Sequence, residues 1–456
     1  MTFDCHTAIR MRRQALLRRY GGRAPRYTSY PTAVQFTPEV DAETYAGWLG
    51  RLPADEPVSL YAHIPFCSRL CWYCGCNTRA VSRGSAVSDY TALLEKEIQL
   101  VGRAAPARLA AAALHLGGGT PNMLTPDDLD RLFGALRQAF DIRPDAEIAA
   151  EIDPAVLTPA WVQAAAAHGL TRASLGVQDL SPHVQKAVNR IEPFDVVAVA
   201  AERLRRAGVA SINLDLMYGL PRQRTDDVIA TIEQVLTLSP ERLAIFGYAH
   251  VPWMKPHQKL IDPADLPGDA ERLEQSEAAA ARLLAAGYVR IGLDHFARPD
   301  DPLAQASRSG RLRRNFQGYT TDQAPTLLGF GASGIGALPD GYVQNQSDEV
   351  GWRRLVGSGR LATARGVRVT AEDRLRGRII ERLMCDLRVD LDTAAGRELD
   401  LGDERTALEA FAADGIVEIH GGVVAVTELG RPFVRSVCAV FDPTSGAVAQ
   451  RYSRAV

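Results

Sequence analysis

The chain has 456 residues, a net charge of -2 and 46% hydrophobic residues, which is the composition of an ordinary globular protein. The near-neutral charge excludes a general nucleic-acid surface, which needs a basic excess, and no apolar run reaches the ~18 residues of a membrane helix. The basic N-terminus has no apolar signal region, so we expect a cytoplasmic protein that contacts neither membrane nor nucleic acid and keeps its cysteines reduced.

Short apolar runs alternate with amphipathic stretches from about Leu60 onward. The predicted strands are 58–63, 112–116, 147–152, 173–177, 211–217, 243–249 and 289–293. The predicted helices are 90–100, 126–140, 159–168, 195–207, 226–238 and 270–286. Repeated strand–helix units of this kind imply a parallel sheet with right-handed crossovers. They fit a doubly wound sheet as well as an open barrel, because periodicity does not separate the two.

Glycine and polar side chains recur directly after the predicted strands. They are the cysteine window 67–76, Gly117–Pro121, Glu151 and Asp153, Gln178 and Asp179, Asp215 with Tyr218 and Gly219, and Tyr248–His250. The carboxyl ends of parallel strands face one mouth in both architectures, and chemistry usually sits there. We therefore expect a ligand site built from these strand ends.

The pattern changes after about Gln346. Amphipathic helices are predicted over 372–387, 404–414 and 429–441, with a hairpin over 417–426 that turns at Gly421-Gly422. This order predicts a compact, mostly helical C-terminal domain. It shows no concentrated basic stripe, so DNA binding does not follow.

Four of the 7 cysteines fall in one window, CSRLCWYCGC at 67–76. A structural zinc site usually takes two ligand pairs far apart in sequence, whereas Cys67, Cys71 and Cys74 follow a C-x3-C-x2-C spacing with no second pair downstream. Three thiolates on one loop suit three corners of a [4Fe–4S] cluster and leave the fourth iron open. Cys76 could take that corner, but its short step from Cys74 leaves little slack, so we place it outside the cluster.

Two other interpretations of the window are a zinc knuckle and plain reduced thiols. The scattered Cys5, Cys385 and Cys438 are expected to be free thiols, the last two packed in the core.

The cysteine spacing resembles the radical S-adenosylmethionine (SAM) superfamily. Further blocks, from about residue 18 to residue 346, resemble the oxygen-independent coproporphyrinogen III oxidases, also called anaerobic coproporphyrinogen III dehydrogenases. These blocks are Pro25–Ala33, Tyr61–Phe66 with Cys76, Gly117–Pro121, Gly176–Asp179, Val188–Arg190, Asp294–Asp301 and Arg314–Thr321. The sequence departs from the family pattern at Trp72-Tyr73, where a smaller residue and a phenylalanine are expected.

The resemblance implies an α/β fold, an open (partial) parallel β/α barrel of the radical SAM type. It implies an N-terminal arm over the active site (1–50), the barrel and its extension (51–365) and the C-terminal domain (366–456). It also implies a reaction of haem and porphyrin biosynthesis. A 5′-deoxyadenosyl radical from SAM, cleaved at a [4Fe–4S] cluster, oxidatively decarboxylates two propionates of coproporphyrinogen III to vinyl groups, giving protoporphyrinogen IX.

By resemblance the family holds two SAM molecules side by side. Carried over by position, the first contacts Tyr61, Gly118, Glu151 and Ile335. The second contacts Tyr73, Gly119, Thr120, Gln178, Arg190, Asp215 and Ala249.

The chemistry of several of these residues fits such contacts. Glu151 and Asp215 can accept ribose hydroxyls, and Arg190 can pair with a methionine carboxylate. The glycine run 117–119 allows close backbone approach to a ligand. The structural alternatives are a helix cap for Asp215, a surface ion pair for Arg190, plain core for Ile335, and a tight turn before a helix capped near Thr125 for the glycines.

Coproporphyrinogen III carries four propionates, so a protein of net charge -2 needs local cations to hold it. We expect Arg26, Arg298 and Arg314 near the substrate, although a solvated loop is an equal alternative for the basic run 308–314. The expected electron donor is a flavodoxin or a ferredoxin, and a monomer is expected because no long apolar stripe is exposed.

Two rival functions belong to related branches of the superfamily. One branch binds and delivers haem, but we expect such carriers to lack Cys76 and the Pro25–Ala33 block, and this sequence has both. The other opens haem with SAM under anaerobic conditions, and the Arg314–Thr321 block argues against it.

Overall fold

The computed structural model describes residues 5–82, 84–396, 398–448, 452 and 454, with backbone only at 5–11 and 447–448. The side chain of Cys5, predicted to be a free thiol, therefore lies outside the described part. Among the described helices, none combines the length and apolar character needed to span a membrane.

A twelve-stranded sheet forms the body of the protein, in the order β16-β15-β14-β13-β1-β4-β5-β6-β7-β8-β10-β9. Its seven central strands run parallel: β13 (Thr326–Phe330), β1 (Val58–Ile64), β4 (Ala110–Gly118), β5 (Asp141–Ile152), β6 (Arg172–Gln178), β7 (Ser211–Tyr218) and β8 (Arg242–Gly247). From β1 to β8 the chain adds strands in one direction, without the reversal of a doubly wound sheet. Since the two edges, β16 and β9, do not pair with each other, the barrel is open, as predicted.

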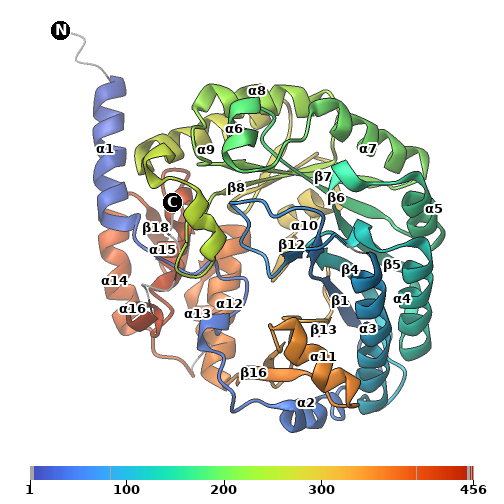
Figure 1. Ribbon diagram of the computed structural model, residues 1–456. Helices are drawn as coiled ribbons and strands as arrows, with labels where there is room; N and C mark the ends of the chain where they lie inside the picture. Colours follow the sequence, from blue (N-terminus) through green and yellow to red (C-terminus); the bar gives the residue numbers. More distant parts are fainter. Residues whose placement is uncertain (1–4, 83, 397, 449–451, 453, 455–456) are drawn as a thin grey trace.

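Helices cover the outside of this curved sheet, as Figure 1 shows. They are α3 (Gly84–Ala104), α4 (Pro126–Ala139), α5 (Pro159–Ala167), α7 (Phe194–Arg206), α8 (Thr225–Leu236) and α9 (Asp269–Ala285). Local sequence sets where they begin. Thr125 caps α4 by accepting from the Asp128 amide, and Asp128 returns a bond to the Thr125 amide. The predicted helix start at Thr125 is confirmed.

Antiparallel strands extend the sheet on both sides, and most were not predicted. They are β14 (Ile335–Leu338), β15 (Gly341–Asn345), β16 (Thr363–Arg368), β10 (His295–Ala297) and β9 (Val289–Ile291). The segment 289–293 does contain a strand, but it lies antiparallel at the edge rather than continuing the parallel series.

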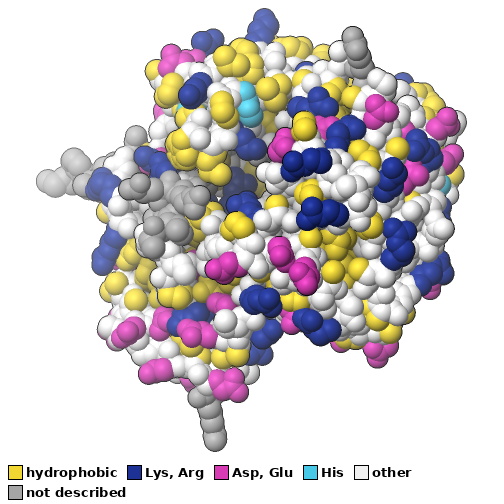
Figure 2. All heavy atoms as spheres, turned by 60° about the horizontal axis from the view of Figure 1, so that its bottom comes forward, with side chains coloured by type: hydrophobic (Ala, Val, Ile, Leu, Met, Phe, Trp, Pro, Cys, Tyr) yellow, Lys and Arg dark blue, Asp and Glu magenta, His cyan; other side chains and the backbone are white. Residues whose placement is uncertain are grey.

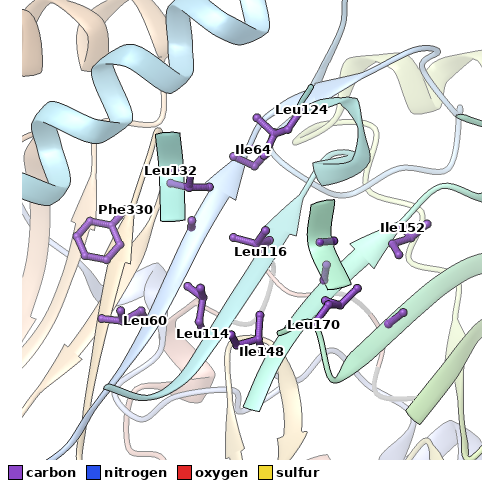
Figure 3. Close-up of a cluster of buried hydrophobic side chains, with 14 of the residues drawn as sticks. Leu60, Ile64, Leu114, Leu116, Leu124, Leu132, Ile148, Ile152, Leu170 and Phe330 are labelled. Carbon is purple, nitrogen blue, oxygen red and sulfur yellow. The ribbon is translucent and has the colours of Figure 1, made fainter. Parts of the chain in front are cut away.

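The main core lies between the sheet and its helices (Figure 3). Leu60 and Ile64 of β1 lie beside Leu114 and Leu116 of β4, and all four are almost fully buried. Burying one such side chain contributes roughly 1.5–3 kcal/mol relative to its exposed state. The core therefore fixes the strand ends that carry the site.

The C-terminal region packs around a second core. It contains α12 (Ala371–Asp386), α13 (Leu391–Ala395), α14 (Gly402–Ala413), α15 (Val434–Ala439), α16 (Ser445–Val448) and a small sheet of β17 (Arg388–Asp390), β19 (Val423–Val426) and β18 (Val417–His420). The predicted hairpin is confirmed, and Cys385 and Cys438 are buried as predicted. The predicted helix over 429–441 is shorter, a 3-10 turn (Arg431–Phe433) followed by α15.

The N-terminal segment joins both cores. Tyr20, Tyr27 and Tyr30 pack into the C-terminal core, whereas Tyr45 and Trp48 pack into the barrel core. The division of the chain at residues 50 and 365 stays a prediction. The remaining elements are α1 (Cys5–Tyr20), α2 (Ala42–Leu49), α6 (Pro182–Ala187), α10 (Pro302–Arg308), α11 (Glu349–Gly357), β2 (Phe66–Cys67), β3 (Arg79–Ala80), β11 (Arg313–Asn315), β12 (Gly318–Thr320) and 3-10 turns at 33–35, 121–123, 154–156, 256–260 and 263–265.

Candidate active site

The cysteine window forms a loop that leaves the carboxyl end of β1. Cys67 ends the short strand β2, which pairs with β3. Cys71 is buried, Cys67 and Cys74 are half-buried, Cys76 is exposed, and all four are free thiols. Four unpaired thiols on one loop remain available as ligands.

The segment after β8 holds this loop in place. His257 Nε2 lies 2.7 Å from the Cys74 carbonyl oxygen, and Lys255 Nζ donates to the Cys76 carbonyl at 2.8 Å. The Gln258 amide donates to the carbonyls of Tyr73 at 2.9 Å and of Ala249 at 3.2 Å. Three side chains on one turn therefore fix the path of the cysteine loop.

Each of the three spaced sulfurs has a polar neighbour. Cys67 Sγ lies 3.0 Å from Thr78 Oγ1, and the Cys76 amide donates to Cys74 Sγ at 3.4 Å. The Cys76 thiol also hydrogen-bonds Cys74 and lowers the pKa of Cys74 to about 7. Cys76 itself has a strongly raised pKa because it is the donor to Cys74.

This donor set fits an iron–sulfur cluster. Donors that favour thiolate over thiol also favour sulfur–iron bonds. Arg190 adds a positive charge, with Nη1 3.7 Å from Cys71 Sγ. Among the described residues, no three His, Cys, Asp or Glu side chains converge on a single-ion site.

Trp72 and Tyr73 anchor the loop from its apolar side. Both pack on a small cluster of Val184, Val188 and Tyr248, together with Leu220 and Ile261. The Trp72 amide donates to the Val188 carbonyl at 3.0 Å. The bulk of Trp72 is therefore taken up by contacts with α6 and its end.

The residues expected around a first SAM lie together. The Glu151 carboxylate accepts from the Gly118 amide at 2.9 Å. Tyr61 faces Gly329 across the β1–β13 pairing, and Gly329 packs against the backbone of Ile335. Burial is the largest influence on the pKa of Glu151 and raises it, but His115 and Gly118 together outweigh burial and lower it. Glu151 is thus an ionised acceptor at the strand ends.

The glycine run 117–119 packs on the protein itself. A Cβ at Gly118, whose φ is +111°, would lie 2.5 Å from the His63 ring. A Cβ at Gly119 would lie 2.6 Å from the Phe66 carbonyl oxygen. These glycines therefore allow close packing within the protein, and the Gly118 amide already donates to Glu151. Contact of the glycine run with SAM stays a prediction.

The residues expected around a second SAM lie along β4, β6, β7 and the cysteine loop. Thr120 Oγ1 donates to Cys67 Sγ at 3.4 Å. The side chains of Gln178 and Arg190 both pack against Gly176. Asp215 pairs with Gly176 in the sheet register.

Asp215 also binds polar side chains on neighbouring strands. It accepts from Ser174 at 2.8 Å and from Asn213 at 2.7 Å, and burial raises its pKa. The buried Asn213 Oδ1 has no hydrogen-bond partner among the described residues. An unsatisfied acceptor beside a buried carboxylate is what a hydroxyl-bearing ligand can satisfy.

Arg190 is buried in an ion-pair network rather than on the surface. Its Nη2 lies 2.8 Å from Glu192 and 3.6 Å from Asp153, and it donates to the Gly176 carbonyl. Arg69 contacts the same two carboxylates, at 3.3 and 3.4 Å. Arg190 Nε lacks a partner among the described residues and remains available to a ligand.

A cavity of about 580 Å³ opens beside these strand ends, between the barrel, the N-terminal arm and the C-terminal domain. We call it the arginine cavity. Its wall contains two aspartates, Asp269 and Asp294, and seven arginines, namely Arg23, Arg26, Arg272, Arg290, Arg314, Arg435 and Arg454. Figure 2 shows a hollow in this face with lysine and arginine side chains around it.

The positive charge of the arginine cavity and the close spacing of its buried guanidinium groups favour an anionic ligand. Burial, then the neighbouring Arg26, lowers the pKa of Arg435 to about 9, and burial lowers that of Arg290 to about 10. Arg314 Nε and Nη1 are buried with no hydrogen-bond partner among the described residues. Donors in this condition favour an anionic ligand.

A smaller cavity of about 180 Å³ lies inside the barrel and is lined by Glu151 and Asp215. Phe246 lines both cavities. Ala249 lines the arginine cavity and is tied to the cysteine loop through Gln258. The expected SAM residues and the arginine cavity are therefore neighbours.

Two of the three predicted substrate arginines line the arginine cavity, Arg26 and Arg314. The placement of Arg298 needs correction. Arg298 donates to the Ser239 carbonyl at 2.9 Å and lies beside Glu241, at the opposite end of β8 from the cavity. Arg298 directly follows β10, which runs antiparallel to β8 and therefore ends beside the first residue of β8, away from the mouth. Of the basic run 308–314, only Arg314 lines the cavity.

Five cavity arginines were not predicted as substrate contacts, namely Arg23, Arg272, Arg290, Arg435 and Arg454. Arg272 lies on α9 among charged residues that look like ordinary surface positions, whereas Arg290 lies on β9 and Arg435 on α15. The sequence carries one signal for Arg435, which is an arginine within the apolar stretch Phe433–Cys438. Its side chain donates to the Pro25 carbonyl at 2.8 Å and to that of Ala24.

Two family models match the chain. The radical SAM superfamily matches residues 61–235, and the HemN C-terminal domain matches residues 369–433. The oxygen-independent coproporphyrinogen III oxidase of Bradyrhizobium diazoefficiens is 48% identical over 441 residues, covering 95% of this chain and 97% of that protein. The protein of the same name from Cereibacter sphaeroides is 43% identical over 440 residues, covering 96% and 97%.

One solved structure is similar along almost the whole chain. Coproporphyrinogen III oxidase (HemN) from Escherichia coli, described as a radical SAM enzyme, superposes with a TM-score of 0.88 at 36% identity. The match covers 94% of this chain and 98% of that one.

Proposed function

We propose the activity of this chain on the basis of its family and its cavity. The chain belongs to the oxygen-independent coproporphyrinogen III oxidases, in the radical SAM superfamily. The chain is a radical SAM oxidoreductase of porphyrin and haem synthesis. Its proposed reaction is the anaerobic oxidative decarboxylation of two propionates of coproporphyrinogen III to vinyl groups, giving protoporphyrinogen IX. The observation that carries this proposal is the arginine cavity beside the cysteine loop.

The cofactors follow from the family, and their binding residues are part of the proposal. Cys67, Cys71 and Cys74 hold a [4Fe–4S] cluster, and Cys76 acts as a hydrogen-bond donor to Cys74 rather than as a ligand. When bound, the cluster and SAM would supply a 5′-deoxyadenosyl radical, which would take one hydrogen atom from a propionate. The vinyl group would then form with release of CO2 and transfer of one further electron to a one-electron acceptor.

Two SAM molecules are proposed, one at each group of strand-end residues. Glu151 accepts ribose hydroxyls of the first, between Tyr61, Gly118 and Ile335. Asp215 and Asn213 accept ribose hydroxyls of the second SAM. The Asn213 Oδ1 atom, which has no partner among the described residues, supports this role. Tyr73, Gly119, Thr120, Gln178, Arg190 and Ala249 complete the second site.

The arginines position the substrate by charge. Seven guanidinium groups face two carboxylates in the arginine cavity, so an acid with four propionates neutralises most of the excess positive charge. Arg26 and Arg314 stand near Ala249 and the cysteine loop, and we propose that they orient the reacting side of the porphyrinogen. The N-terminal arm and Arg435 shield the cavity from water, which protects a radical from side reactions.

An anaerobic assay tests the proposal. The protein is reconstituted with iron and sulfide and given dithionite, SAM and coproporphyrinogen III, and the products are followed by chromatography and mass. Protoporphyrinogen IX formed together with 5′-deoxyadenosine is the expected result. Formation of 5′-deoxyadenosine without decarboxylation contradicts the substrate but keeps the cofactor sites, and haem is then tested as ligand and as substrate.

A further inference from the structure

The cysteine loop and the two segments that pack beside it contain no acidic residue. Residues 67–82, 182–191 and 250–261 contain none of the 54 Asp and Glu of the chain. They contact one another directly. Asn189 Nδ2 donates to the Leu70 carbonyl at 3.0 Å, and Lys255 Nζ donates to the Cys76 carbonyl at 2.8 Å. The three segments form a surface next to the cluster loop whose own charged side chains are all basic, and we call it the cysteine-loop surface. Acidic side chains of other segments reach it, among them Asp227 beside His183 and Glu349 beside Arg79.

Lysines, rather than arginines, supply the unneutralised charge of this surface. Arg69 and Arg190 are paired with Glu192, and Arg79 is paired with Glu349 at 2.5 Å. The chain has only four lysines, and three of them, Lys186, Lys255 and Lys259, lie in these segments. Lys186 and Lys259 are exposed. The fourth, Lys96, is exposed on α3.

Large apolar side chains are exposed on the same surface. Trp253, Met254, Leu260 and Ile191 are each more than half exposed, and they make up half of the eight large hydrophobic side chains exposed in the described part of the chain. Trp253 also lines the arginine cavity, whereas the others lie outside it. An apolar patch in a basic surface is typical of a protein-binding site.

We infer that the cysteine-loop surface docks an acidic flavodoxin that reduces the cluster, an inference that rests on the proposed function. One electron leaves the reduced flavin and enters the oxidised cluster, and no atom is transferred. Lys186 and Lys259 attract the acidic rim of the carrier, while Met254, Leu260 and Ile191 receive the apolar edge of the flavin. Electron transfer requires the flavin to lie close to the cluster, so the carrier must bind at the surface above the cysteine loop.

The surface is suited to brief encounters. Redox complexes bury little area and depend on complementary charge for fast association, which salt weakens. Lysine ammonium groups are compact and well hydrated, so they steer a partner without locking it in place. The exposed apolar side chains are few, so product complexes can separate and the next electron can be delivered.

Charge reversal at Lys186 and Lys259 tests the inference. The reconstituted K186E/K259E variant is mixed with fully reduced acidic flavodoxin, and oxidation of the flavin is followed by stopped-flow absorbance. The second-order rate constant should fall by about 10-fold or more at low salt, with a weaker salt dependence. Flavodoxin binding measured by calorimetry should weaken in parallel. K96E is the matched control and should behave as the wild type.

The apolar part has its own pair of variants. M254S/L260S should slow flavin oxidation at every salt concentration, whereas L284S, on α9 near the opposite end of the barrel, should not. Iron content and dithionite-driven SAM cleavage should be unchanged in all variants, which shows that they fold and carry the cluster. Rates and affinities equal to the wild type in both surface variants overturn the inference.

Two further outcomes separate the possibilities. If an acidic ferredoxin binds and transfers electrons as fast as flavodoxin, with the same loss in M254S/L260S, the choice of a flavin carrier is wrong. If porphyrinogen is not decarboxylated with any reductant, the proposed function fails, but flavin oxidation and SAM cleavage still report on the surface.

Discussion

Arg314 Nη2 lies 3.4 Å from the backbone carbonyl oxygen of Arg26. This contact joins β11 to the N-terminal arm and brings two guanidinium groups to one wall of the arginine cavity. Asp294 lies close to both. Burial raises its pKa, but His295, Arg314 and Arg26 together lower it to about 2. Asp294 and Asp269 together do not balance the seven arginines of the cavity, so its wall suits an anionic ligand.

Replacing either arginine by glutamine should weaken substrate use. A lost charge-assisted hydrogen bond costs about 1.5–3 kcal/mol, so Arg26→Gln or Arg314→Gln should lower kcat/KM for coproporphyrinogen by about 10- to 100-fold. SAM cleavage without substrate should persist. Arg298→Gln is the control, because Arg298 lies at the other end of β8. An equal loss of kcat/KM in Arg298→Gln contradicts the assignment.

Cys76→Ala should leave the cluster in place. Cys76 is exposed and its thiol reaches Cys74 as a hydrogen-bond donor, so the variant loses that thiol donor but keeps the bond from the backbone amide of residue 76 to Cys74 Sγ. Iron and sulfide content should match the wild type, whereas Cys71→Ser should lose most of both. The reduction potential, followed by electron paramagnetic resonance, should become more negative in Cys76→Ala, since one hydrogen bond to the thiolate is lost. Loss of iron in Cys76→Ala makes it a ligand.

Arg190→Met should destabilise the protein because Arg69 alone then faces two buried carboxylates, Glu192 and Asp153. Breaking a buried pair from one side costs about 3–5 kcal/mol. Adding Glu192→Gln should recover most of the thermal midpoint, because Arg69 still balances Asp153. SAM cleavage should not recover in the double variant if Arg190 also binds the methionine carboxylate. Full recovery of both properties shows a purely structural role.

Glu97 should make stability depend on pH. It is buried, accepts from the Gly331 amide and from Asn345, both at 2.6 Å, and burial raises its pKa to about 7. Its stabilising contribution is complete below its unfolded pKa near 4.5 and is lost as pH rises through 7. The free energy at stake is about 3 kcal/mol.

Thermal midpoints of wild type and Glu97→Gln test this effect. The midpoint difference should move in favour of the glutamine variant between pH 5 and pH 8. The glutamine side chain also alters the hydrogen bonds to Asn345 and Trp352, but that cost is the same at both pH values. A difference that does not change with pH shows that Glu97 is already ionised in the folded protein.

Much of the barrel could be predicted because short apolar-rich runs alternate with amphipathic helical patterns along the sequence. The predicted strand 211–217 lies within β7. Thr125 correctly predicted the start of α4 as its N-cap residue. The strands after residue 326 were missed because glycines at 329, 331, 334 and 336 break the alternation that marks a strand. Gly329 is required there, since a Cβ would meet the backbone of Ile335.

The site was predictable only where chemistry is concentrated in sequence. Four cysteines in ten residues are visible without a structure, and so is the polar character of the strand ends. The arginine cavity is not visible, because its arginines come from positions as far apart as 23 and 454. Arg298 was predicted to contact the substrate, but its side chain lies at the end of β8 that is opposite the cavity.

The arginine cavity takes its walls from both ends of the chain, and Arg435 ties the last helices to Pro25. The cysteine loop and the turn that holds it are complete by Gln258. Translation therefore delivers the cysteine loop long before the C-terminal residues that complete the arginine cavity. A chain abandoned shortly before Arg435 would carry the means to spend SAM but no substrate to accept the radical. Prompt clearance of unfinished chains would then spare the cell both lost cofactor and oxidative damage.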